Sequence, residues 1–294
     1  MKQDLLEQAS IYLLRQGFTV KSFTRACFDI MARAGNRIFL IKAIEDANSL
    51  THETILSMKV ISSYLNAAPI ILSEKAGNKL EDNVVYSRLG ATTLNFNSFK
   101  QAIENKFPFL ESTHAGITAN INPSRFRIER EKHGYSVNSL ARKIGVSRKT
   151  IEKYETKKAQ LTLRNAVRIY HALGEKIFER INVFNEVKLP EQQFRSHSVS
   201  ALQISAKYSS LGFSSSETQK VPFDVVAKLD KEIILTEIGN KNTAQLESIS
   251  RLIDADRLVI FDKKKPKQYD VPMLKKEEFL EFEKARELIK FVNR

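Results

Sequence analysis

The stretch that decides the fold reads Arg130-Glu131-Lys132-His133-Gly134-Tyr135-Ser136, then Leu140-Ala141-Arg142-Lys143-Ile144-Gly145-Val146-Ser147, then Ile151-Glu152-Lys153-Tyr154-Glu155. Apolar residues recur through it at helical spacing: Ile128, Val137, Leu140, Ala141, Ile144, Val146, Ile151 and Tyr154. Each glycine suits a helix exit with positive φ, and the serine two residues later can cap the next helix. The pattern predicts three short helices with two tight joints, the second short enough to cross its helices steeply.

This block resembles the helix-turn-helix of the Cro/repressor type. The resemblance runs from about Arg125 through a fourth and fifth helix over Leu163 to Leu173 and ends at Gly174, which implies a lambda-repressor-like five-helix domain over residues 120–182. It makes Ser147 to Glu155 the recognition helix and Val137 to Ile144 the helix that braces it. It also implies the family's usual pairing of the first and third helices, here Arg130 with Glu155. One departure is visible, because Thr156-Lys157-Lys158 stands where the family often has Gly or Pro after the recognition helix.

The resemblance implies a DNA-binding set on this block. Arg148 and Lys149 fall at the exposed start of the recognition helix and would read base edges in the major groove. The other members would steady the block on phosphates, and they are Ser147, Lys153, Lys157, Lys158, Ser136 and Arg125. A generic helical bundle with a solvated basic face is the alternative.

Charge supports DNA binding. Between Ser124 and Arg180 there are 15 Lys and Arg against 6 Glu and no Asp, which gives nine of the chain's 13 formal positive charges. Such a concentrated excess is expected of a phosphate-binding surface, because neutralised phosphates release counterions and so drive association.

The flanking regions alternate strands and helices, which indicates an α/β sheet. Strands are expected over residues 37–43 and 69–72, with a helix over 51–65 between them. The C-terminal third repeats this order with an offset of 195 residues, for example from Gly17-Phe18 to Gly212-Phe213 and from Asp29 to Asp224. A third landmark with the same offset is the end of the following strand, at Lys42 and at Glu237. The three landmarks predict two copies of one α/β domain, over residues 1–110 and 198–294. A single charged helix is expected from Lys275 to Arg294.

Each copy resembles the PD-(D/E)XK restriction-nuclease fold, in which an Asp and a second acid hold Mg²⁺ beside a Lys. Copy one has Asp29, but Lys42 or Leu40 stands at the position of the second acid. Copy two has Asp224 and Glu237, yet Gly239 stands where the lysine belongs, with Lys241 the nearest substitute. The expected fold is therefore two degenerate restriction-nuclease-like α/β domains that flank the helical domain, with no catalytic or metal-ligating residues.

Composition excludes other classes of protein. The single cysteine, Cys27, cannot form an internal disulfide, and no apolar run approaches the roughly 20 residues that cross a bilayer. The five His residues are scattered, and no phosphate-binding glycine loop or nucleophile elbow occurs. We expect a cytoplasmic protein without a cofactor and without a membrane partner.

The arrangement as a whole resembles a family of archaeal HTH-type transcriptional regulators. The resemblance implies a sequence-specific regulator that binds double-stranded DNA. Because one recognition helix reads only a few base pairs, we expect a homodimer, held by the α/β domains. Two alternatives remain: a metal-dependent nuclease or DNA-processing factor that uses Asp224 and Glu237, and α/β domains that act as a scaffold or ligand sensor.

Overall fold

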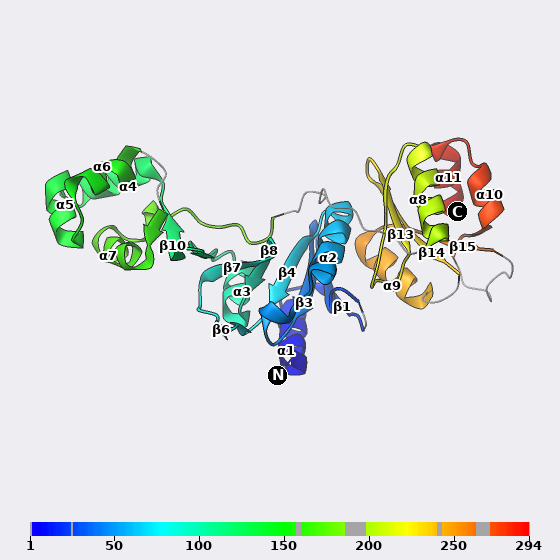
Figure 1. Ribbon diagram of the computed structural model, residues 1–294, viewed down its shortest axis with the longest axis horizontal. Coiled ribbons are helices and arrows are strands. Elements are labelled where there is room, and N and C mark those ends of the chain that lie inside the picture. The colour runs from blue at the N-terminus through cyan, green and yellow to red at the C-terminus, as the bar shows by residue number, and fades with distance from the viewer. Residues whose placement is uncertain are drawn as a thin grey trace. The chain divides into compact units, whose positions relative to one another are not determined.

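A computed structural model describes residues 2–24, 26–156, 160–185, 198–239, 243–262 and 271–293 (Figure 1). The chain divides into two compact units. The first holds Met1–Glu45, Ser49–Ile71 and Phe184–Arg294, and the second holds Asp46–Asn48 and Leu72–Val183. No helix in the described parts is long and apolar enough to cross a membrane.

The N-terminal α/β region begins with a helix and a three-stranded antiparallel meander, followed by a helix and a fourth strand beside β3. Its elements are α1 (Lys2–Arg15), β1 (Thr19–Ser22), β2 (Ile30–Ala34), β3 (Arg37–Ala43), α2 (His52–Leu65) and β4 (Ala68–Leu72), with one turn of 3-10 helix, η1 (Ala47–Ser49), before α2. Thr51 caps α2 by accepting a hydrogen bond from the Thr54 amide, at 3.3 Å. The strand and helix patterns predicted for residues 37–72 lie where the structure has β3, α2 and β4.

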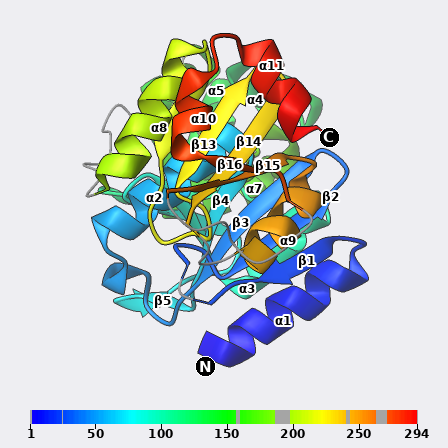
Figure 2. The same ribbon diagram turned by 90° about the vertical axis from the view of Figure 1, so that its right-hand side faces the viewer.

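The C-terminal region has the same order of elements and adds a strand and two helices. It comprises α8 (Val199–Ser210), β12 (Ser214–Glu217), β13 (Val225–Leu229), β14 (Glu232–Ile238), α9 (Thr243–Ile253), β15 (Asp256–Phe261), β16 (Met273–Lys275), α10 (Lys276–Glu281) and α11 (Ala285–Val292). Helices α8, α10 and α11 cover one face of its sheet and α9 the other (Figure 2). The single C-terminal helix that we expected is wrong, because α10 ends before Phe282 and the backbone is extended at Lys284, so the chain forms two helices. The break lets the Phe282 ring pack against Phe291, with ring centroids 6.3 Å apart.

The backbone hydrogen bonds of the two α/β regions are related by the same offset of 195 residues. Thr19 pairs with Arg33 across β1 and β2, and Ser214 pairs with Lys228 across β12 and β13. The backbone amides of Asp29 and Asp224 each donate to the following strand, to Ile41 and Thr236 respectively, both at 2.8 Å. The two regions therefore share one strand register, which is a stronger likeness than shared element order.

Within the first unit, the two α/β regions bury apolar faces against each other. One hydrophobic cluster takes residues from both: Met31, Leu40, Met58, Ile61 and Leu65 from the first region, and Val226, Leu235, Leu246, Ile249 and Val259 from the second. The faces come from the helix after the third strand and from the strands beneath it, α2 with β2 and β3 in one region and α9 with β13 and β14 in the other.

Two polar contacts across this interface are related by the repeat. Arg33 pairs with Asp254 at 2.6 Å, and Lys228 donates to the Asn66 side chain at 2.8 Å. Lys228 is the counterpart of Arg33, and Asp254 and Asn66 each follow the last residue of the corresponding helix with φ near +50°. Such reciprocal contacts define an isologous interface, here between two parts of one chain.

The second unit begins with a short hairpin and a strand pair, and continues into the helical block. It contains β5 (Lys75–Ala76), β6 (Asn78–Lys79), β7 (Val84–Arg88), β8 (Ala91–Leu94), α3 (Phe96–Ile103), β9 (Leu110–Thr113), β10 (Gly116–Asn120), α4 (Pro123–Lys132), α5 (Val137–Ile144), α6 (Arg148–Thr156), β11 (Gln160–Thr162), α7 (Leu163–Leu173) and the 3-10 turn η2 (Glu175–Ile177). Strands β8, β7, β9, β10 and β11 are neighbours in that order. Because β11 follows α6 and pairs with β10, the sheet anchors the end of the helix-turn-helix.

The described part of the helical block has four α-helices, the strand β11 and the 3-10 turn η2, where we expected five helices. Its core takes residues from every helix, and includes Phe126, Leu140, Ile144, Ile151, Tyr154 and Ile169. Ile128, which the spacing placed among the apolar positions, is 60% exposed on α4. The expected joints are present: Gly134 and Gly145 have φ of +73° and +70°.

We predict that Arg33→Ala loosens the contact between the two α/β regions. It removes the ion pair with Asp254 and a 3.0 Å hydrogen bond to the Leu252 carbonyl, at a cost of about 1–3 kcal/mol. Cys27 reports on this interface, because it lies in the shared core and its amide donates to the Lys220 carbonyl at 2.7 Å. Burial raises the pKa of the Cys27 thiol to about 12, so the native protein should react slowly with thiol reagents at pH 8.

The measurement is the rate of thiol labelling of the folded protein. Arg33→Ala should raise this rate by about tenfold, the equivalent of ~1.4 kcal/mol of easier opening. Arg37→Ala is the control, because Arg37 lies on the same hairpin and stacks over the Phe18 ring. Equal labelling rates in the two variants would contradict the assignment.

We predict that Gly145→Ala destabilises the protein more than Gly134→Ala. Both substitutions force alanine into the left-handed region, at a cost of about 1–2 kcal/mol. At Gly145 the new Cβ would also lie 2.9 Å from Nη1 of Arg168, which donates to the Ile144 carbonyl, whereas at Gly134 it would meet nothing within 4 Å. Chemical denaturation should show about 1 kcal/mol of additional loss at Gly145, and equal losses would show that Arg168 does not brace the joint.

Candidate nucleic-acid interface

Helix α6 buries one face and exposes the other. Ser147 caps it, accepting a hydrogen bond from the Thr150 amide at 3.2 Å, and Ile151 and Tyr154 are buried in the core of the block. The side chains of Arg148, Lys149, Glu152, Lys153 and Thr156 are exposed. These positions recur at helical spacing, so they form one continuous face.

Helix α5 and the joint after it hold α6 in place. Ser136 caps α5, accepting from the Ser139 amide at 3.0 Å, and Leu140, Ala141 and Ile144 are buried. At the joint, Arg168 of α7 donates to the Ile144 carbonyl at 2.8 Å. The carbonyl of the last α5 residue, which has no partner within its helix, is thus satisfied by a neighbouring helix.

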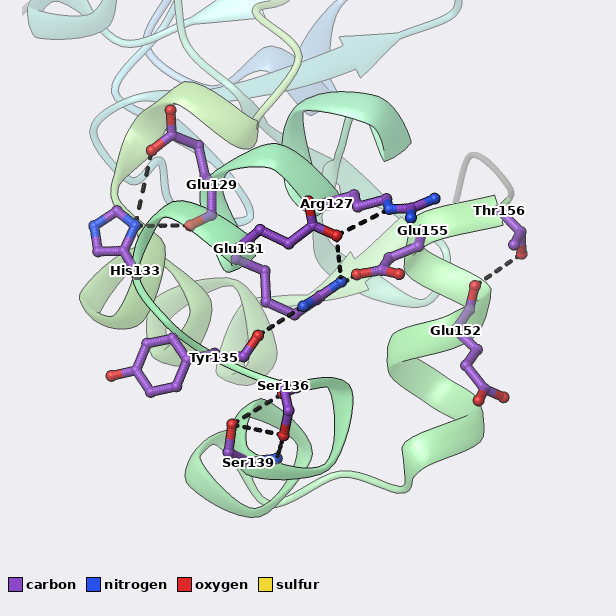
Figure 3. A network of polar contacts seen from close by, with 11 residues as sticks. Arg127, Glu129, Glu131, His133, Tyr135, Ser136, Ser139, Glu152, Glu155 and Thr156 are labelled. Atoms are coloured by element: carbon purple, nitrogen blue, oxygen red, sulfur yellow. Dashed lines mark hydrogen bonds and ion pairs between the residues drawn. The ribbon is translucent and has the colours of Figure 1, made fainter.

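A buried arginine ties α4 to α6. The Arg130 guanidinium binds Glu155, the Tyr135 carbonyl at 2.6 Å and Glu131 at 3.2 Å, and its side chain is only 8% exposed. Figure 3 shows the three acceptors converging from two helices and the turn between α4 and α5. Glu155 is 12% exposed, so each charge depends on the other for compensation. The predicted pairing of Arg130 with Glu155 is confirmed.

Six of the eight predicted DNA-binding residues lie in the described part of the helical block, and all six are exposed. Lys149 and Lys153 are exposed on α6, Arg125 is exposed on α4, and Ser147 and Ser136 are helix caps at the starts of α6 and α5. Arg148 is also exposed, but its Nε donates to Glu152 at 2.7 Å. Lys157 and Lys158 lie outside the described residues.

Sequence reasoning missed two residues that shape this surface. Glu152 is the partner of Arg148, and the spacing of i and i+4 on a helix could have indicated the pair. Arg168 braces the joint between α5 and α6, and no sequence signal marks that contact because the two segments are 24 residues apart.

The acid site of the N-terminal region does not fit a divalent cation. Asp29 accepts hydrogen bonds from the ammonium groups of Lys42 and Lys2, each at 3.2 Å, and from the Ala43 amide at 3.0 Å. Lys42 is the counterpart of Glu237 in the repeat. A positive side chain therefore stands where the nuclease fold has its second acid, and it neutralises the carboxylate that would hold the metal.

The acid site of the C-terminal region is incomplete. Asp224 accepts from the Ile238 amide at 2.6 Å, and Glu237 is buried at 1% exposure on β14. Among the residues that the structure describes, no three His, Cys, Asp or Glu side chains lie together as a metal site. Gly239 occupies the position of the family's lysine, and Lys241 lies outside the described residues. We derive no metal chemistry from this pair.

Two parts of the chain match known domain families. Residues 2–108 match the PD-(D/E)XK superfamily domain, and residues 126–179 match a helix-turn-helix family. A search of solved structures finds no significant match.

Curated relatives match along nearly the whole chain. A protein of Archaeoglobus fulgidus is 30% identical over 298 residues, which cover 97% of this chain and 96% of that protein. A protein of Methanocaldococcus jannaschii is 29% identical over 99% of this chain and 96% of its own length, and one of Thermococcus gammatolerans is 27% identical over the same shares. All three carry the name "putative HTH-type transcriptional regulatory protein". In this chain the PD-(D/E)XK-like domain precedes the helix-turn-helix domain. The chain therefore belongs to this archaeal family of helix-turn-helix proteins.

Proposed function

We propose that the protein is a transcription regulator that binds specific sequences of double-stranded DNA through α6. The observation that carries the proposal is the exposed start of α6, where Arg148 and Lys149 project from a helix whose opposite face is buried. Side chains at the start of such a helix reach base edges when the helix enters the major groove. The names of the curated relatives support a role in transcription.

In this proposal the remaining residues position the block. The Ser136 and Ser147 caps lie at the starts of α5 and α6, where free backbone amides and the helix dipole favour phosphate. Lys153, Arg125, Lys157 and Lys158 add positive charge for the DNA backbone. Base contacts by Arg148 and Lys149 select the sequence.

The proposal includes three domains and a homodimer. The domains are residues 1–110, 120–182 and 198–294, of which the last is a second, degenerate copy of the first. A dimer would place two copies of α6 about 34 Å apart on one face of DNA. The interface between α2 and α9 is already filled within one chain, so a dimer held by the α/β domains would use a different surface.

The second candidate function is metal-dependent DNA cleavage. It is favoured by two acidic residues on paired strands, because Asp224 directly precedes β13 and Glu237 lies on β14. The absence of a third ligand among the described residues counts against it. So does Gly239 in place of the lysine that would orient the attacking water.

Genomic selection of bound fragments tests the main proposal. The expected result is a shared motif with two half-sites about 34 Å apart, one helical turn of DNA or a multiple of it. Fragments without a common motif would leave only general DNA binding.

We predict that two substitutions on α6 weaken DNA binding in different ways. Arg148→Ala should cost about 1–3 kcal/mol on the selected site and relax the preference at one base pair. Lys153→Ala should weaken binding to all sequences alike and reduce the slope of affinity against salt by about one. Titrations on the selected site, a mutated site and a random duplex at several salt concentrations separate the two, and identical profiles would contradict the assigned roles.

We predict that the purified protein does not cleave duplex, branched or single-stranded DNA in the presence of Mg²⁺ or Mn²⁺. The measurement is a nicking and cleavage assay, with Asp224→Ala prepared in parallel. Metal-dependent cleavage that is lost in Asp224→Ala would overturn the prediction, whereas cleavage that persists would indicate a contaminant.

A further inference from the structure

An acidic residue lies in the middle of the basic face of the recognition helix. Glu152 is exposed one turn after Arg148, with Lys149 and Lys153 on the same face. A carboxylate there would be repelled by DNA phosphates as the helix approaches. Glu152 therefore lowers the affinity of the helix for DNA of any sequence. A residue with this effect is useful in a DNA-binding helix when it adds selectivity.

The contact between Glu152 and Arg148 uses one nitrogen of the arginine and one oxygen of the glutamate. Arg148 uses Nε, which donates to Oε1 of Glu152 at 2.7 Å, and the two side chains are 67% and 47% exposed. Among the described residues, no acceptor binds the two terminal nitrogens of the guanidinium, and these are the groups that bind O6 and N7 of guanine. No described residue donates to Oε2 of Glu152.

The pair restricts the arginine before DNA arrives. A long, exposed arginine samples many rotamers, and fixing it costs conformational entropy on binding. A contact between residues i and i+4 holds the guanidinium against the helix in advance. At the same time, the second carboxylate oxygen is an acceptor that suits the N4 amino group of cytosine and repels the O4 of thymine.

We propose that Glu152 is a specificity-determining residue that acts with Arg148 as one unit for G·C recognition. Arg148 binds guanine, while Glu152 positions Arg148, accepts a hydrogen bond from cytosine and disfavours thymine. This inference rests on the proposed function, because it requires α6 in the major groove of a selected site.

The test compares Glu152→Gln with a matched control, Glu131→Gln. Glu131 forms the same kind of exposed i, i+4 pair, with Arg127 at 3.1 Å, but on α4. It also accepts a hydrogen bond from Arg130 at 3.2 Å, and the amide oxygen of a glutamine can accept both hydrogen bonds. Each substitution removes one negative charge from the helical block and keeps the side chain's shape. Affinities are measured for the selected site, for the same site with its contacted G·C changed to A·T, and for a random duplex.

Glu152→Gln should bind the random duplex several-fold more tightly and lose about tenfold of its preference for G·C over A·T. Glu131→Gln should tighten general binding and keep that preference. Arg148→Ala should cost less discrimination in the Glu152→Gln background than in the native protein, because the two residues act together. Circular dichroism melts show that each variant is folded.

The two proposals fail in different ways. A native protein that selects no motif overturns the proposed function and this inference together. A native protein that selects a motif, with an unchanged G·C preference in Glu152→Gln, overturns this inference alone. An equal loss of affinity for all three duplexes in Glu152→Gln would assign Glu152 a structural role and also overturn it.

Discussion

The first unit depends on the mutual burial of two apolar faces that neither α/β region could leave in water. Helices α2 and α9, with the strands beneath them, contribute to one core. The burial of apolar area is the main favourable term in folding, and two related surfaces satisfy each other with one set of reciprocal contacts. Two related polar contacts fix how the faces align, one between Arg33 and Asp254 and the other between Lys228 and Asn66. The chain thus contains within itself an arrangement that other proteins reach by forming a dimer.

One aspartate in each α/β region has a structural role. In the N-terminal region, the Asp29 carboxylate is held by two ammonium groups and a backbone amide, so its charge is balanced without a metal. In the C-terminal region, Asp224 still accepts from the following strand, as Asp29 does. Both aspartates therefore join adjacent strands, a structural role that needs no metal.

The helical block combines rigid support with an exposed face. The buried Arg130 ties α4 to α6, and Arg168 closes the joint between α5 and α6. Glu155 lies near the end of α6, and the joint closed by Arg168 lies just before its start. Helix α6 is therefore held at both of its ends. Sequence reasoning found the helices, the joints and the Arg130–Glu155 pair. It missed Arg168 and Glu152, and it predicted one C-terminal helix where extended backbone at Lys284 separates α10 from α11.

The sequence by itself determined the features that a few neighbouring residues dictate: the capped helices, the glycine joints, the strand pattern, the repeat, and a non-acidic residue, Lys42 or Leu40, at the position of the second acid. These depend on backbone preferences and on side chains that act within one or two turns. The tertiary structure alone decided that α2 and α9 share a core, that β11 joins β10, and that Arg168 reaches Ile144. Those contacts join residues that are distant in the chain, and their geometry depends on how apolar faces pack rather than on any local pattern.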